Sequence, residues 1–198
     1  MTGKVIALHR LQGVPAEMSD EALLGACAVG DNAALAALFD RYQTHVQRFL
    51  ARLSGTEQQD LDDLVQSTFL EVHRSASRYA GRAQVKTWLF GIAANVARHH
   101  ARSEHRRRLF AAAYAAQRPA PAAGRLDDAA HNRQQLARLG TALRGLPHDQ
   151  RVVFVLCDLE DVAGVEAARA LGVPEGTLFR RLHDARKRLR AALDAGAP

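Results

Sequence analysis

The chain has 198 residues, 47% of them hydrophobic, and a formal net charge of +6. This length accommodates one large domain or two small ones, and the positive charge suits a polyanionic partner, nucleic acid before an anionic membrane surface. Two distant cysteines in apolar runs, Cys27 and Cys157, argue against a disulfide framework or a zinc ligand set. The apolar run at 5–8 is too short for a signal peptide and no segment approaches a membrane span, so we expect a cytoplasmic protein without membrane insertion.

Nearly every long periodic segment predicts a helix, because Ala, Leu, Arg and Glu dominate and the alternation typical of strands is absent. Ser19 and Asp31 are candidate helix caps. The expected helices of the first half are 20–29, 32–53, 60–75 and 85–108, with a loop at 78–84. The next stretch is rich in Ala, contains prolines and lacks a core face, which predicts a flexible linker. Further helices are expected at 127–146, 149–159, 165–171 and 174–193.

The predicted fold class is therefore all-α, with two small helical domains joined by a flexible linker. The expected divisions are an N-terminal extension at 1–18, a first domain at 19–108, the linker at 109–126 and a second domain at 127–195.

The helix expected at 60–75 has one apolar stripe and an unusual opposite face. The residues expected to point inward are Leu61, Leu64, Val65, Thr68 and Val72. The opposite side carries Asp63, Gln66 and Leu70, with Asp62 and Phe69 at its margin. A leucine that points outward among acids is typical of a docking surface for a basic protein partner. Because acids repel phosphates, this face is not expected to meet DNA.

The helix expected at 85–108 also has two faces. Its predicted core stripe is Val85, Leu89, Ile92 and Val96. The neighbouring face combines an aromatic ring, a small residue, an amide and several cationic groups: Trp88, Gly91, Asn95, Arg98, His99, Arg102 and Arg106. Cations neutralise phosphates and an aromatic ring can stack on an unpaired base, so this mixture suits partly single-stranded DNA. A solvated face beside a buried Trp88 is the simpler alternative.

The C-terminal segment has the layout of a helix-turn-helix. A short helix at 165–171 is followed by the turn Gly172-Val173-Pro174 and a longer basic helix. The expected inward stripe of the last helix is Leu178, Leu182, Ala185 and Leu189. Its outward side shows Thr177, Phe179, Arg180, His183, Asp184 and Lys187. An arginine there can contact guanine and an aromatic ring can touch a thymine methyl group. A plain helical hairpin remains the alternative.

Two blocks of this sequence resemble the second and fourth regions of extracytoplasmic-function (ECF) sigma factors of bacterial RNA polymerase. The first block is DLVQSTF at 63–69, followed by Gly81-Arg82 and KTWLFGIAAN at 86–95. The second runs from Leu146-Pro147 to Val155 and continues with LGVPEGTL at 171–178 and RLHDARKRL at 181–189. The blocks cover about 20–193 in the order that the family has. The resemblance implies a factor without catalytic activity or cofactor that brings core RNA polymerase to promoter DNA. It also implies control by an anti-sigma factor, and we expect the free chain to be a monomer.

The resemblance implies a role for three groups of residues. Docking on core polymerase is assigned to Asp62, Asp63, Gln66, Phe69 and Leu70. Recognition and melting of the minus-10 element, with a flipped base held by the loop 78–84, is assigned to Arg78, Tyr79, Arg82, Lys86, Trp88, Asn95, Arg98, His99 and Arg102. Recognition of the minus-35 element is assigned to Thr177, Phe179, Arg180, Arg181, His183, Asp184 and Lys187. Many relatives carry basic residues at 179 and 184, so the minus-35 sequence is left open.

Linker length bears on how the two domains are held. About 20 flexible residues have a typical reach of roughly 25 Å, and at most about 70 Å when stretched. Two promoter elements about two helical turns apart, at roughly 34–36 Å per turn, require an extended linker. We therefore expect polymerase to hold the linker extended and the free factor to be more compact.

Two other functions fit parts of the sequence. A stand-alone helix-turn-helix regulator explains the C-terminal half but leaves Trp88, Asn95 and the acids around Asp63 without a role. An enzyme would rest on His99, His100 and His105 as metal ligands, but their spacing matches no metal motif. No nucleophile–base set or phosphate-cradling glycine loop accompanies them.

Overall fold

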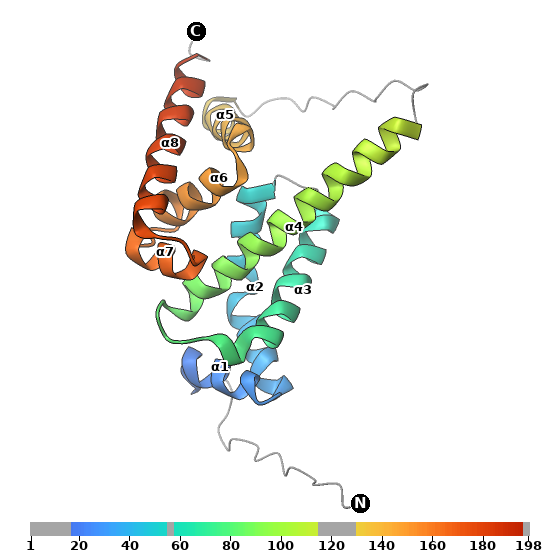
Figure 1. Cartoon of the computed structure of the whole chain (residues 1–198), viewed down its shortest axis with the longest axis vertical. Helices are drawn as coiled ribbons and strands as arrows, with labels where there is room; N and C mark the ends of the chain where they lie inside the picture. The colour runs from blue at the N-terminus through green and yellow to red at the C-terminus, as the bar shows by residue number, and fades with distance from the viewer. Residues whose placement is uncertain (1–16, 55–57, 115–129, 196–198) are drawn as a thin grey trace, which may run out of the picture.

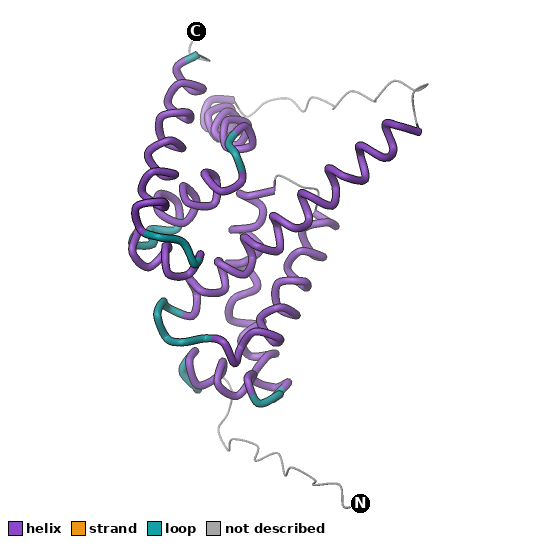
Figure 2. The backbone as a smooth tube through the Cα atoms, in the orientation of Figure 1, coloured by secondary structure: helices purple, strands orange, loops and turns teal. Residues whose placement is uncertain are grey.

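The computed structural model describes residues 17–54, 58–114 and 130–195, with side chains at 17–54, 60–104, 106–107 and 138–195. Within these ranges every regular element is a helix (Figures 1 and 2), which confirms the all-α fold class. None of the described helices has the length and apolar character that crossing a membrane requires. The predicted N-terminal extension lies outside the described residues up to position 16.

The first half forms a bundle of four helices. They are α1 (Asp20–Ala28), α2 (Asn32–Ser54), α3 (Gln58–Ser75) and α4 (Val85–Tyr114), with the short 3-10 turn η2 (Ala76–Arg78) after α3. Both expected caps are confirmed: the Ser19 hydroxyl accepts from the N–H of Ala22, and Oδ1 of Asp31 accepts from the N–H groups of Ala33 and Ala34. In the core, the ring of Phe49 stacks on that of Phe90 with their centroids 4.5 Å apart.

The inward stripe of α3 is as predicted, but that of α4 is only half right. All five expected residues of α3 are buried, and so are Val85 and Leu89 of α4. The buried row of α4 then continues through Ala93 and Ala97, whereas Ile92 and Val96 are half-buried. Alanines permit a close approach of helix backbones, so α4 packs on α2 and α3 along them and turns the larger aliphatic pair toward the surface.

The second half carries the predicted helix-turn-helix. Its elements are α5 (Ala130–Gly145), α6 (His148–Phe154), the π-helical segment η3 (Val155–Leu159), α7 (Gly164–Leu171) and α8 (Glu175–Asp194). Gly172 ends α7 with φ +65°, a left-handed conformation that glycine adopts without steric cost. The four residues expected to face inward from α8 are all buried.

The predicted linker begins too early. Helix α4 continues to Tyr114, so residues 109–114 belong to a helix. An alanine-rich run has high helix propensity even where it has no core face, and the linker prediction overlooked this. Positions 115–126 lie outside the described residues, and α5 begins at Ala130.

The two halves pack against each other. Helix α7 lies on α4, and α2 contacts α5, α6 and η3 (Figure 1). Buried residues of both halves, among them Phe49, Val153 and Leu156, form one continuous hydrophobic cluster. Helix α8 lies on the outer side of the second half, away from the four-helix bundle.

Candidate nucleic-acid interface

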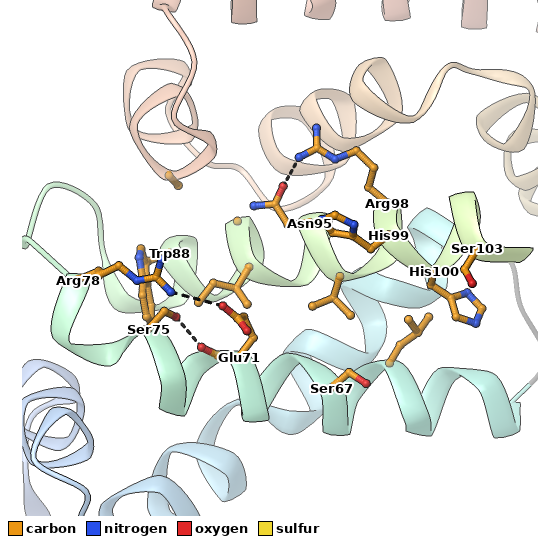
Figure 3. A pocket seen from close by; sticks show the side chains of 15 residues that line it. Ser67, Glu71, Ser75, Arg78, Trp88, Asn95, Arg98, His99, His100 and Ser103 are labelled. Atoms are coloured by element: carbon orange, nitrogen blue, oxygen red, sulfur yellow. Dashed lines mark hydrogen bonds and ion pairs between the residues drawn. The ribbon is translucent and has the colours of Figure 1, made fainter.

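A groove of about 900 Å³ runs between α3 and α4, where most of the predicted minus-10 face lies. Its apolar floor includes the half-buried Ile92 and Val96. Its polar rim comes from both helices, with Ser67 and Glu71 on α3 and His99 on α4 (Figure 3). Trp88, Asn95 and Arg98 also line it, so one groove brings together the aromatic ring, the amide and a cation of the predicted face.

The loop that precedes α4 is braced by Tyr79. The Tyr79 hydroxyl donates to the carbonyl of Ala83 at 2.7 Å, and its ring meets that of Trp88 edge-on with centroids 5.4 Å apart. Burial raises the pKa of Tyr79, which keeps the phenol a donor. Gly81 turns the loop with φ +67°. The Tyr79 hydroxyl thus contacts the loop and its ring contacts Trp88 of α4, two contacts that the sequence did not indicate.

The cationic groups around the groove differ in how they are held. Arg78 is exposed and lies 3.6 Å from Glu71, and Arg82 is exposed. Nη2 of Arg98 donates to Oδ1 of Asn95 at 2.5 Å, while its buried Nε has no hydrogen-bond partner. Of the other basic side chains of the predicted set on α4, Lys86 is half-buried, whereas His99 and Arg102 are exposed. With Arg106 and His148, these two and Arg98 line a second cavity of about 690 Å³.

The predicted polymerase-docking face is present on α3, with one correction. Asp62, Asp63 and Gln66 are exposed, and Leu70 is 52% exposed. The acids line a shallow cavity of about 440 Å³. Phe69 is only 4% exposed because its ring packs edge-on against Phe39, with their centroids 4.8 Å apart. Its predicted direct contact with a partner is therefore wrong for this arrangement, and Phe69 supports the face from beneath.

The predicted minus-35 face lies on the outer side of α8. Arg180, His183 and Lys187 are exposed, and Thr177 and Asp184 are half-buried. Phe179 is 49% exposed and covers Gly164, where an added Cβ would lie 2.7 Å from a ring carbon. Arg181 differs from the prediction because its Nη2 lies 2.8 Å from the carboxylate of Asp149 on α6, so it is engaged within the second half.

Three acids of the second half were not singled out by the sequence, yet each contacts the first half. Asp149 lies 3.8 Å from Nη1 of Arg98, Glu160 lies 3.7 Å from Nζ of Lys86, and Glu166 accepts from the N–H of Gln84 at 2.9 Å. Glu160 also pairs with Arg52. The partners in these four contacts are 51 to 108 positions apart in the sequence, which is far longer than a helical turn, so helical periodicity carries no signal for them. In the sequence, the three acids are distinguished only by being acidic in a basic chain.

The histidines show no metal site in the part of the chain whose side chains are described. No group of three His, Cys, Asp or Glu residues is arranged there to hold an ion. The side chain of His105, the third ligand of that alternative, lies outside the described side chains.

Comparison with known proteins agrees with the two-block resemblance. Residues 38–108 match the family Sigma-70 region 2, and residues 136–189 match Sigma-70, region 4. The chain is 34% identical over 179 residues to the ECF RNA polymerase sigma factor SigM of Mycobacterium tuberculosis, covering 87% of this chain and 84% of SigM. It is 35% identical over 156 residues to the RNA polymerase sigma factor CarQ of Myxococcus xanthus, covering 79% and 87%.

A solved structure has the same architecture. CnrH, in complex with the cytosolic domain of CnrY, superimposes with a TM-score of 0.63 at 28% identity, covering 90% of this chain and 99% of CnrH. Two matched regions in this order, together with relatives at 34% and 35% identity, leave one assignment. The chain belongs to the ECF family of RNA polymerase sigma factors.

Proposed function

We propose that this chain binds core RNA polymerase, directs it to promoters and assists DNA melting there, without catalytic activity of its own. The observation that carries the proposal is one chain with two separate faces whose side chains suit DNA, the groove of α4 with Trp88 and Asn95 and the outer side of α8. Membership of the ECF family supports it. A stand-alone regulator would need only the face on α8. That alternative assigns no role to the groove of α4.

The proposed domains follow the two matched regions. Residues 19–108 serve as region 2, for polymerase docking and the minus-10 element, and 127–195 serve as region 4, for the minus-35 element; the matches at 38–108 and 136–189 support both. We use region 2 below for α1–α4 and region 4 for α5–α8.

In region 2 the groove beside α4 receives the unpaired minus-10 strand. Flipping a base costs a few kcal/mol, which a pocket and a stacking surface offset. The indole of Trp88, held by Tyr79, provides the flat apolar surface, and Asn95 provides donor and acceptor groups for a base edge. Arg98 and His99 follow about one turn after Asn95 and Arg102 about one turn after them, where they meet the phosphates. Arg78, Arg82 and Lys86 flank the loop that holds the flipped base.

Polymerase docks on the opposite side of region 2. The exposed Leu70 supplies apolar contact area, while Asp62, Asp63 and Gln66 select a basic partner surface. Because the cavity beside the docking acids is lined by α2 and α3, whereas the groove is lined by other residues of α3 and by α4, both faces can be occupied at once.

In region 4 the outer side of α8 enters the major groove of the minus-35 element. Arg180 is placed for bidentate contact with guanine, and Phe179 for contact with a thymine methyl group. Thr177, His183 and Lys187 extend the face, and Asp184 offers an acceptor for a cytosine amino group.

We further propose that an anti-sigma protein controls this chain, which is otherwise a monomer in the cytoplasm beside polymerase and DNA. The neighbouring structure of CnrH contains a second protein, the cytosolic domain of CnrY.

Transcription in vitro tests the proposal. Core polymerase from the encoding bacterium is incubated with fragments of its genome, with and without the purified chain, and transcript start sites are sequenced. We expect a set of start sites that depends on the chain and shares two spaced upstream elements. An Arg180→Ala chain should use the same sites more weakly. If the chain neither associates with core polymerase nor adds start sites, the proposal is wrong.

A further inference from the structure

The groove beside α4 contains a carboxylate where a surface made only to hold phosphates would carry cations. Glu71 of α3 is the one acid among the described residues that line this groove, and its side chain is 41% exposed. In Figure 3 it lies beside Ser75, Arg78 and Trp88, whereas His99 lies farther along α4. Because a carboxylate repels phosphate, this end of the groove disfavours the DNA backbone and leaves room for a base.

The carboxylate of Glu71 is free to take a new partner. Nη2 of Arg78 lies 3.6 Å from Oε1, and Nη1 of Arg74 lies 4.0 Å from Oε2. Both distances are too long for a hydrogen bond. The arginine side chains are 71% and 72% exposed, so water screens both ion pairs. The hydroxyl of Ser75 donates to the backbone carbonyl of Glu71, which leaves both carboxylate oxygens available.

The surroundings of the carboxylate suit one unpaired base. The half-buried side chains of Trp88 and Ile92 give this groove an apolar part on which a base can stack. A stacked base presents its polar edge at the rim, where Glu71 and Arg78 supply an acceptor and a donor side by side. The rim therefore carries the two kinds of group that read a base edge.

The four bases differ in what their unpaired edges offer a carboxylate. A carboxylate only accepts hydrogen bonds, and its two oxygens accept best from two adjacent donors. Guanine presents such a pair, N1–H and the 2-amino group, with the acceptor O6 next to them. Adenine and cytosine present one amino group beside a ring nitrogen that accepts, and thymine presents N3–H between two carbonyl oxygens. Guanine is therefore the best match.

We propose that Glu71 makes guanine the preferred unpaired base at this end of the groove. Its carboxylate oxygens accept from N1–H and the 2-amino group, and Arg78 donates to O6. This inference rests on the proposed function and adds a base preference to the same site. Cations alone would hold the strand through its phosphates, with little preference among bases.

Hypoxanthine tests the contact because it differs from guanine only by lacking the 2-amino group. Holoenzyme made from core polymerase and the full chain is titrated with forked promoter fragments that are single-stranded over the minus-10 element. Each unpaired position carries guanine, hypoxanthine or thymine in turn. We expect one position at which guanine binds roughly tenfold more tightly than hypoxanthine, because a hydrogen bond to a charged acceptor is lost.

Variants of Glu71 should remove this preference without a general loss of binding. In Glu71→Ala the two bases should bind within about twofold of each other, and Glu71→Gln, which keeps one acceptor, should retain a preference of roughly threefold. Affinity for the thymine fragment should stay the same or rise, since a charge that repels phosphate is gone. A merely structural role of Glu71 would weaken binding of all fragments equally.

Two further variants separate the parts of the contact. Arg78→Ala should weaken guanine and hypoxanthine alike, because both bases carry O6, and the preference between them should remain. Asp40→Asn makes the same charge change as Glu71→Gln at an exposed position of α2 that does not line the groove. It should keep the full preference for guanine.

Two results overturn the inference. One is equal binding of guanine and hypoxanthine at every unpaired position by the unaltered holoenzyme. The other is a preference for guanine that survives in Glu71→Ala. If the chain forms no holoenzyme and directs no transcription, the proposed function fails instead, so the two failures are distinguishable.

Discussion

The two cationic faces of this protein have similar side chains but different surroundings. The face on α4 lies under α7, and two of its cations are paired with carboxylates of the other region: Lys86 with Glu160 and Arg98 with Asp149. On α8, Phe179 and Arg180 point to solvent. Positive charge in a sequence therefore predicts affinity for nucleic acid without predicting access. In this molecule access is decided by which helix of the second half packs on the first.

The largest expected effect comes from removing the amide and the cation of the α4 groove. Asn95→Ala with Arg98→Ala should slow initiation by roughly a hundredfold, because base-edge and stacking contacts contribute about 1–3 kcal/mol each. The measurement is the rate of short-transcript synthesis by preassembled holoenzyme, in which loss of the Arg98–Asp149 contact no longer matters. Arg107→Ala, elsewhere on α4, should retain most activity. Equal losses in both variants would contradict the assignment of this face.

Removing the guanidinium of Arg180 should have a smaller and different effect. Arg180→Ala is expected to weaken holoenzyme binding to duplex promoter roughly tenfold, because one bidentate contact with a base is lost. Binding to a template that carries only the minus-10 element should be unchanged. Arg190→Ala, on the same helix beyond the proposed face, is the control. A variant that loses affinity equally on both templates would show that α8 does not read the upstream element.

A still smaller effect is expected where Phe179 rests on Gly164. In Gly164→Ala the new Cβ would approach the ring to 2.7 Å and force it from its position. Displacing one side chain from its rotamer should reduce minus-35 binding by roughly threefold and alter preference at one base pair. Gly145→Ala, where nothing lies within 4 Å of an added Cβ, should have no effect. If the base preference is unaltered, Phe179 does not contribute to recognition of the minus-35 element.

The smallest effect concerns pH and the contact between the two regions. Burial lowers the pKa of His148, whose ring faces the carbonyl of Ala94 with Arg98, Asp149 and Arg151 around it. The separated form therefore takes up a proton more readily than the packed one as pH falls below about 6.5, the usual value for histidine. Packing of the regions should be fully stable above that pH and weaken below it. Scattering at pH 7.5 and pH 5.5 measures this, with His148→Gln as the variant that should respond less. An equal response in both would contradict the role of His148.

Local rules predicted much of this fold, and long-range contacts account for what was missed. Capping by Ser19 and the inward rows of α3 and α8 follow from spacing and side-chain chemistry within a single helix, so the sequence was sufficient for them. The burial of Phe69 depends on Phe39 of another helix, and the half-buried position of Ile92 depends on how α4 meets α3. No periodicity within one helix encodes such pairings.

The same limit applies to the candidate site. The residues of the two DNA faces were identifiable because aromatic, amide and cationic groups share a helix face, and because their motifs resemble a known family. The contact of Glu166 with the N–H of Gln84 became visible only when α7 was placed on α4. Arg181 was expected on the DNA face, yet it meets Asp149 because α6 crosses beside α8.

Permanganate reactivity of promoter thymines tests the central claim most directly. Complexes are assembled from core polymerase, the full chain and a promoter fragment, and unpaired thymines upstream of the start site are mapped. The account predicts reactive thymines with the unaltered chain, none without it, and strongly reduced reactivity with Asn95→Ala and Arg98→Ala. Stable promoter complexes in which the unaltered chain opens no base pairs would contradict it.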